Sequence, residues 1–219
     1  MEIAFIFFGT LFGLYTLSTL WKRWRRRSRI QFIQRFTFPR RPARELKHHY
    51  PFLSGDQILE VMEALREYFI ICLYSKREMV GMPSRAVDIA WHEFILETRH
   101  YHAFCQGAFG RFFHHTPSGS MPESTTMDQC MRRAWFLSCA RESINPHDPA
   151  ELPILFAIDE QLSIPDGYTY SPEWLQQQGG RHSSAGGCGG GDYHDCKGDH
   201  DNTDDSGGSD GCSGGCGGD

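Results

Sequence analysis

Apolar side chains recur every three or four positions over much of residues 54–164, the spacing of one face of an α-helix. Ser54, with Gln57 three residues later, is typical of a capping box and predicts that a helix begins there. After the loop KREMVGMPS, Ser84 suits the N-cap of a second helix. The second apolar stripe is expected to continue for about 25 residues, to Gly110. No segment alternates with a period of two, so the sequence predicts an all-α fold.

Two further helices are expected before the composition changes. Thr125 and Asp128 suit the cap and first turn of a third helix, which is expected to end near Arg141. The proline-rich loop INPHDPAELP separates this helix from a short fourth one at ILFAIDEQLS. These helices together predict a small helical bundle over residues 45–178.

The N-terminal segment is apolar without a polar face, since residues 3–21 carry no charge. At about 1.5 Å per residue, such a helix spans roughly 28 Å, close to the hydrocarbon thickness of a bilayer. The basic run KRWRRRSR follows the apolar segment, the reverse of a secretory signal. We therefore expect a transmembrane helix, single-pass, with the N-terminus outside and the later domain cytosolic. A buried core helix or a cleaved peptide is the alternative.

This topology predicts a plasma (inner) membrane location and a lipid contact on the basic side. Trp21 and Trp24 suit the headgroup level of a bilayer. The flank over residues 22–44 is expected to be a basic juxtamembrane connector that attracts anionic lipid. No segment carries a nucleic-acid-binding motif, so the expected partners are the lipid bilayer and an unidentified protein.

The C-terminal segment, residues 179–219, differs from the rest in charge and composition. The net charge of −5 is unevenly distributed, with basic residues near the N-terminus and aspartates in this tail. The tail is rich in glycine and has no large aliphatic side chain. Because it cannot bury enough apolar surface to offset its ordering entropy, the tail is expected to be disordered.

The eight cysteines form two groups of four. Those within helical patterns are expected to behave as small apolar side chains and to form no structural disulfide: Cys72, Cys105, Cys130 and Cys139. Those in the tail, together with three histidines, offer ligands that suit zinc or copper, but without zinc-finger pairing. We expect them to bind zinc weakly and without fixed stoichiometry: Cys188, Cys196, Cys212, Cys216, His182, His194 and His200.

The second helix carries the candidate polar site. On a continuous helical wheel Asp88, His92, Arg99 and His102 share one side, opposite Trp91. Asp88 and His92 are one turn apart, so the carboxylate is able to fix the tautomer of the imidazole. A carboxylate behind a metal-bound histidine has this arrangement. The alternative is a half-buried polar face with no ligand.

Further metal ligands would come from His114 and His115, or from the pair at residues 48–49. No HExxH or CxxC spacing accompanies them. Arg111 beside His114 and His115 is an alternative binding site for an anion. The chemistry of this segment therefore stays open between a metal site, an anion site and a solvated surface.

The run VDIAWHEFILETRHYHAFCQGAFG resembles the glycine-rich domain-containing protein-like family. Its motif has an aspartate, a Trp-His pair, a tyrosine, a cysteine and an aromatic-glycine pair. The glycine-rich tail is also similar to the architecture of that family. Plant members have Trp-His-x-His, and Phe94 occupies the second histidine position here, which weakens a two-histidine metal site. The resemblance implies a helical domain and no established catalytic activity. The matching residues are Asp88, Trp91, His92, Tyr101, Cys105, Phe109 and Gly110.

The absence of a catalytic motif in the sequence favours a non-enzymatic role. We expect a membrane-anchored protein whose cytosolic helical domain acts as a binding or scaffold module. The alternative is a metal-dependent enzyme or metal-binding protein, with zinc as the candidate ion, centred on His92 with His114 and His115.

Overall fold

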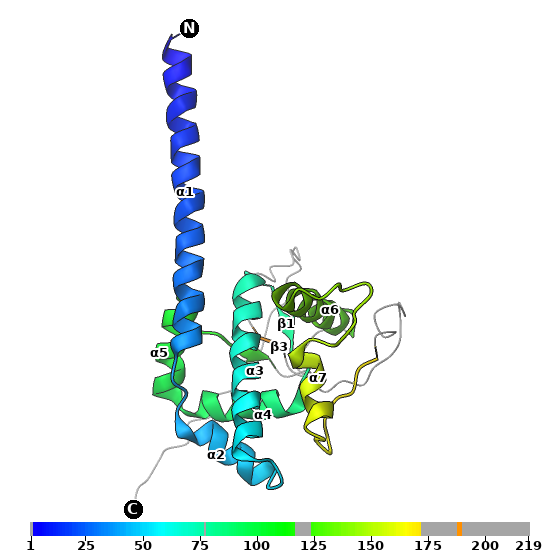
Figure 1. The fold of residues 1–219 in the computed structure, drawn as a ribbon. Coiled ribbons are helices and arrows are strands. Elements are labelled where there is room, and N and C mark those ends of the chain that lie inside the picture. Colours follow the sequence, from blue (N-terminus) through cyan, green and yellow to red (C-terminus); the bar gives the residue numbers. More distant parts are fainter. Residues whose placement is uncertain (1, 77, 117–123, 172–187, 190–219) are drawn as a thin grey trace, which may run out of the picture.

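The computed structural model describes residues 2–76, 78–116, 124–171 and 188–189. This part of the chain is mostly helical, as the sequence predicts (Figure 1). The helices are α1 (Glu2–Arg35), α2 (Arg40–His49), α3 (Gly55–Tyr74), α4 (Arg85–Leu96), α5 (Thr98–Ala108), α6 (Ser124–Glu142) and α7 (Ile154–Gln161). Three short strands accompany them: β1 (Val80–Gly81), β2 (His115–Thr116) and β3 (Cys188–Gly189).

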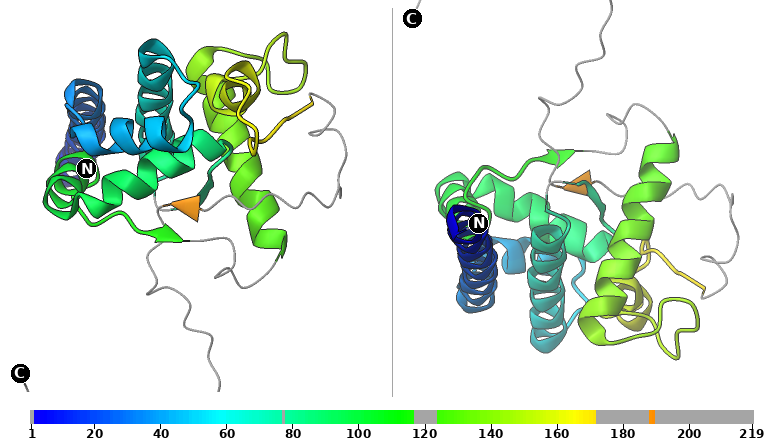
Figure 2. Two further views of the ribbon diagram at one scale, coloured as in Figure 1. Left: turned by 90° about the horizontal axis from the view of Figure 1, so that it is seen from below. Right: turned by 90° about the horizontal axis from the view of Figure 1, so that it is seen from above.

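Helix α3 lies at the centre of the domain. It contacts α1, α2, α4, α6 and α7, and the two views of Figure 2 show α1 on one side of it and α6 with α7 on the other. Its predicted capping box is confirmed, because the Ser54 side chain accepts from Gln57 N while the Gln57 side chain accepts from Ser54 N. Tyr68 and Phe69 are fully buried on α3. A helix that is contacted on so many sides positions most of the other helices of the domain.

The predicted helix over residues 85–110 is wrong as one continuous element. It breaks at Glu97, where φ is −78° and ψ is 58°, into α4 and α5. The break lets both helices turn their aromatic faces toward one core, so that the rings of Phe94 and Tyr101 meet at 5.2 Å. The continuous helical wheel therefore describes α4 correctly but does not extend to Arg99 and His102.

Helix α1 is one unbroken element in which the apolar and basic segments follow each other. No helix in the described part of the chain is long and apolar enough to cross a membrane, so the predicted transmembrane helix over 3–21 is not supported. The described side chains begin at Phe7 and charge begins at Lys22, an interval shorter than the roughly 20 apolar residues of a span. The side chains of residues 1–6 lie outside the described ones.

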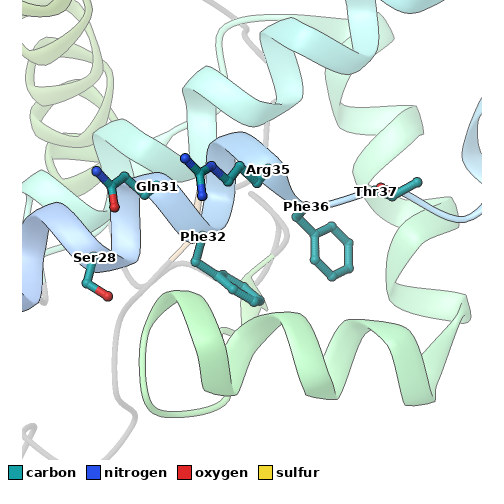
Figure 3. A pocket seen from close by; sticks show the side chains of 6 residues that line it. All are labelled: Ser28, Gln31, Phe32, Arg35, Phe36 and Thr37. Carbon is teal, nitrogen blue, oxygen red and sulfur yellow. The ribbon is translucent and has the colours of Figure 1, made fainter.

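The C-terminal part of α1 belongs to the helical domain. Ile33 is fully buried, and the Phe36 ring lies 4.9 Å from that of Phe104 on α5. Figure 3 shows Phe32 of α1, and Phe36 directly after that helix, turned toward α5 beside a surface pocket. Gly107 allows this close approach, since a Cβ atom there would clash with the Phe32 ring. The domain thus begins before residue 45, and much of the expected connector over 22–44 is helical.

The strands form a small sheet that the sequence does not predict. Their order is β1-β3-β2, and both outer strands pair antiparallel with β3. His115 pairs with Gly189, and Thr116 pairs with Cys188. The expectation of a disordered tail is therefore wrong for residues 188–189, and the other tail residues lie outside the described part. The sheet could not be predicted because strands of two residues are too short to show an alternation of apolar and polar positions.

The cysteines at residues 72, 105 and 139 are free and buried, and Cys130 is buried as well. Burial raises the pKa of the Cys105 thiol to about 11, and it raises the pKa of the Cys139 thiol to about 11 as well. A thiol with so high a pKa stays protonated at neutral pH and is a poor nucleophile. These side chains act as small apolar groups of the core.

Trp91 offers the sharpest test of the packing, because it is fully buried and its ring lies 5.3 Å from Tyr68 and 5.6 Å from Phe113. Replacing Trp91 with Ala is expected to lower the free energy of unfolding by about 3–5 kcal/mol. The matched control is Leu96→Ala on the same helix, where the side chain is 55% exposed and little should change. Urea denaturation measures the free energy of unfolding of both variants. Equal and small effects would show that α4 does not pack with Trp91 inward.

Candidate metal centre

Helix α4 carries two of the three residues of the candidate site. Its N-terminus is capped as predicted, with the Ser84 hydroxyl accepting from Val87 N at 3.1 Å. Asp88 falls in the first helical turn, where the helix dipole favours a carboxylate. His92 follows one turn later, and its Nδ1 lies 3.6 Å from Asp88 Oδ2 and 2.9 Å from the Asp88 carbonyl oxygen. The two side chains are neighbours as predicted, but the hydrogen bond of the imidazole is to the backbone carbonyl of Asp88 and not to its carboxylate.

A second carboxylate holds the start of α4 from outside. Asp159 on α7 is buried and accepts hydrogen bonds from Ser84 Oγ and Arg85 N, both at 2.6 Å, and from Ala86 N at 3.2 Å. It also accepts from Tyr168 N at 3.0 Å. Asp159 is not among the residues predicted from the sequence. An acid within the apolar run ILFAIDEQLS was the available indication that α7 buries a carboxylate.

His115 completes the site from a distant segment. Its Nε2 lies 3.0 Å from Asp88 Oδ1, and its ring lies 4.3 Å from the rings of both Trp91 and His92. Two contacts hold this segment, since Tyr101 Oη donates to Phe113 O at 2.5 Å and β2 pairs with β3. His115 therefore reaches Asp88 through tertiary structure rather than through helical spacing.

The three side chains differ in exposure. The side chains of Asp88 and His115 are 5% and 8% exposed, whereas that of His92 is 49% exposed. A buried carboxylate without a partner is costly, so Asp88 requires the hydrogen bond or a cation. The site is therefore closed toward the core and open toward solvent on the His92 side.

The arginine nearest to Asp88 pairs mainly with another carboxylate. Arg85 reaches to 3.9 Å from Asp88 Oδ2, but its Nε donates to Asp166 Oδ2 at 3.1 Å. Tyr50 Oη also donates to Asp166, at 2.7 Å. Burial alone would raise the pKa of Asp166, but the hydrogen bonds from Tyr50 and Arg85 outweigh it and lower that pKa. Arg85 is thus engaged mainly with Asp166, which leaves the Asp88 carboxylate available to another cation.

The donor set fits a divalent transition metal ion. One ligand atom from each of Asp88, His92 and His115 lies within 4.8 Å of the others. Nitrogen and oxygen ligands at about 2.0–2.1 Å around tetrahedral zinc lie roughly 3.3 Å apart. The Asp88–His115 distance of 3.0 Å already matches that separation. His92 Nδ1 lies 3.6 Å from Asp88 Oδ2, slightly beyond that separation, and its half-exposed side chain has room to adjust.

Several predicted site residues lie elsewhere. Arg99 and His102 are exposed on α5, beyond the break at Glu97. His114 is exposed and its ring lies 4.8 Å from Phe112, so the structure selects His115 from that pair. The histidines at 48–49 are exposed at the end of α2. Among the tail cysteines only Cys188 falls in the described part, within β3, and Cys196, Cys212 and Cys216 fall outside it.

The other motif residues serve the core around the site. Trp91 Nε1 donates to Tyr101 Oη at 3.2 Å, and burial raises the pKa of the Tyr101 hydroxyl above its usual range. Cys105 is buried, and the Phe109 ring stacks on that of Phe113 at 4.4 Å. Gly110 has φ of +72°, a left-handed conformation that favours glycine. The motif thus contributes Asp88 and His92 to the site and Trp91 to the packing of His115, and its other residues stabilise the surrounding core.

Comparison with known proteins identifies a family. Neither the curated proteins nor the solved structures include a match to this chain. The model of the UCP032817-like family matches residues 28–192, which leaves out the apolar start of α1 and takes in Asp88, His92, His115 and β3. Because that match covers most of the sequence, the chain belongs to the UCP032817-like family.

Proposed function

We propose that the helical domain is a metal-binding module that holds a divalent transition metal ion, zinc in the first instance, between Asp88, His92 and His115. The observation that carries the proposal is the convergence of three ligand-type atoms from two separate segments within 4.8 Å. Two imidazoles and a carboxylate form a donor set that zinc sites commonly use. The proposal assigns metal binding and no reaction.

The surroundings of the site support this assignment. Three protein ligands leave one position of a tetrahedral ion open, and the exposed side of His92 is where that position would face. Trp91 packs against the edge of the His115 ring and fixes it from the core side. A buried Asp–His hydrogen bond that only joins β2 to α4 is the competing interpretation, since it uses the same 3.0 Å contact.

Removal of one ligand separates these interpretations. The full-length chain is expected to bind one tightly held zinc equivalent that His115→Ala loses, in addition to any weak binding by the tail cysteines. The matched control is His114→Ala, which removes the exposed neighbouring imidazole and should keep that equivalent. Competition with a chromophoric chelator measures the stoichiometry and affinity.

Cobalt(II) substitution identifies the ligands that are lost. A nitrogen and oxygen site gives d–d absorption without the sulfur charge-transfer band that cysteine ligands would produce. Metal stoichiometry that is the same in the wild type and in His115→Ala would contradict the proposal and favour the purely structural Asp–His pair.

A second candidate function is attachment of this domain to a membrane as a binding module for an unidentified partner. The observation that favours it is the N-terminal half of α1, which stands clear of the other helices in Figure 1. Large apolar side chains there are highly exposed. Extended exposed apolar patches usually mark contact with a membrane or another protein. The domain would then lie on the cytosolic side of the plasma (inner) membrane. The exposed residues are Phe7, Phe8, Leu11, Phe12, Leu14, Tyr15, Leu17, Leu20, Trp21 and Trp24.

Flotation with lipid vesicles tests this second function. The full chain is expected to float with phosphatidylcholine vesicles, and the double variant Phe8→Glu/Phe12→Glu is expected to lose flotation because charge in the hydrocarbon layer is costly. Phe136→Glu is the matched control, since Phe136 is an exposed aromatic side chain on α6, away from α1. Flotation that survives the α1 variant would exclude the apolar part of α1 as the attachment site.

A further inference from the structure

A basic pocket lies where α1 meets the helical domain, and it shares no residue with the candidate metal centre. Its volume is about 350 Å³, and its walls come from α1, from the end of α3 and from the residues that follow α3 and α5. Six of the lining side chains are cationic, and none of the described lining residues is acidic. The lining residues are Trp21, Lys22, Arg25, Arg26, Arg29, Leu73, Lys76, Phe109 and Arg111.

Aromatic rings and a glycine orient the guanidinium groups of this pocket. Arg25 lies over the Trp21 ring at 5.1 Å, and Arg26 lies over the Tyr74 ring at 5.5 Å. Stacking of this kind holds a guanidinium while leaving its N–H groups in the ring plane able to donate. Arg29 lies against Gly110, where a Cβ atom would clash with its terminal nitrogen. The glycine of the motif therefore makes room for an arginine of α1.

Five of the six lining cations, all except Arg111, form no ion pair within the described part of the chain. The ion pairs there involve other arginines, such as Arg41, Arg66 and Arg141. Burial, followed by the positive charge of Arg25, lowers the pKa of Arg29. Cations held close together repel each other, so a bound anion would stabilise this arrangement.

One residue of the pocket has an unfavourable backbone conformation. Lys76 directly follows Ser75, the C-cap of α3, and has φ of +66°, a left-handed conformation that is unfavourable for a non-glycine residue. Glycine is the residue that usually occupies such a position after a helix. A lysine there places a further charge at the pocket at some cost to the fold.

We infer that this pocket binds the phosphomonoester headgroup of an anionic phospholipid, such as phosphatidic acid. A phosphomonoester carries about 1.5 to 2 negative charges and three acceptor oxygens, which suits several guanidinium donors better than the single charge of a phosphodiester. A lipid is the source because Trp21 belongs both to the pocket and to the exposed apolar surface of α1. An acyl chain that leaves the pocket there can follow that surface.

The inference rests on the second proposed function, membrane attachment, but its test does not require a membrane. The full chain in nonionic micelles is titrated with short-chain phosphatidic acid, short-chain phosphatidylserine and inorganic phosphate. Intrinsic tryptophan fluorescence reports binding, because Trp21 lines the pocket. Phosphatidic acid is expected to bind at least about tenfold more tightly than either of the other two.

Two double variants test the location. Arg26→Gln/Arg29→Gln removes two lining cations and is expected to weaken phosphatidic acid binding by about tenfold or more. Arg23→Gln/Arg27→Gln removes the same charge from the same helix at positions that do not line the pocket, so affinity should stay within about twofold. Lys76→Gly should also weaken binding while leaving the melting temperature unchanged or higher, which separates loss of binding from loss of folding.

The results that would contradict this inference can be told apart. Equal affinity for phosphatidic acid and phosphatidylserine would contradict binding in the pocket. Equal losses of affinity in the two arginine double variants would contradict it as well. Either result would favour diffuse electrostatic attraction between the basic helix and the lipid. Inorganic phosphate that binds as tightly as phosphatidic acid would overturn the lipid as the source of the headgroup. Vesicle flotation that depends on Phe8 and Phe12 would stand in either case, so membrane attachment and headgroup recognition fail separately.

Discussion

The buried carboxylate of Asp159 holds α4 in place, and both the core and the candidate site depend on that placement. The first amide groups of a helix have no partner within the helix and have to find one elsewhere when they are buried. Asp159 supplies that partner from α7 and also ties in Tyr168, so the loop after α7 closes over the same turn. Removing it would leave buried donors unpaired, which costs more than a hydrogen bond contributes.

Once α4 is fixed, its two faces have separate roles. Trp91 faces the core and packs between α3 and the segment that follows α5. Asp88 and His92 occupy the other side, where His115 arrives with β2. Trp91 contacts the His115 ring as well, so the packing of the core and the geometry of the candidate site are coupled through one aromatic side chain. Mutations of the core are therefore expected to disturb the site even without touching its ligands.

Features that depend on residues close in sequence could be predicted, and those that depend on distant residues could not. The caps at Ser54 and Ser84, and the pairing of Asp88 with His92, involve residues three or four positions apart. The break at Glu97 removed Arg99 and His102 from the site, and no local breaker residue marks it. His115 was one of two adjacent candidates, and only the path of the chain from Phe113 into β2 distinguishes it from His114.

Helix α1 also combines features that depend on nearby residues with features that depend on distant ones. Its apolar and basic segments are plain in the sequence, but the docking of its C-terminal part depends on Phe32 meeting a glycine of α5. That docking places the arginines of α1 beside Lys76 and Arg111. Composition predicts neither the start of the domain before residue 45 nor the basic pocket. Both require two segments about 80 residues apart in sequence to meet.

The most direct test of the metal centre is X-ray absorption spectroscopy at the zinc edge of the full chain loaded with one equivalent. The account predicts a first shell of nitrogen and oxygen atoms at about 2.0–2.1 Å, with the outer-shell scattering of two imidazoles and no sulfur. A first shell containing sulfur at about 2.3 Å would assign the ion to tail cysteines and contradict a centre formed by Asp88, His92 and His115.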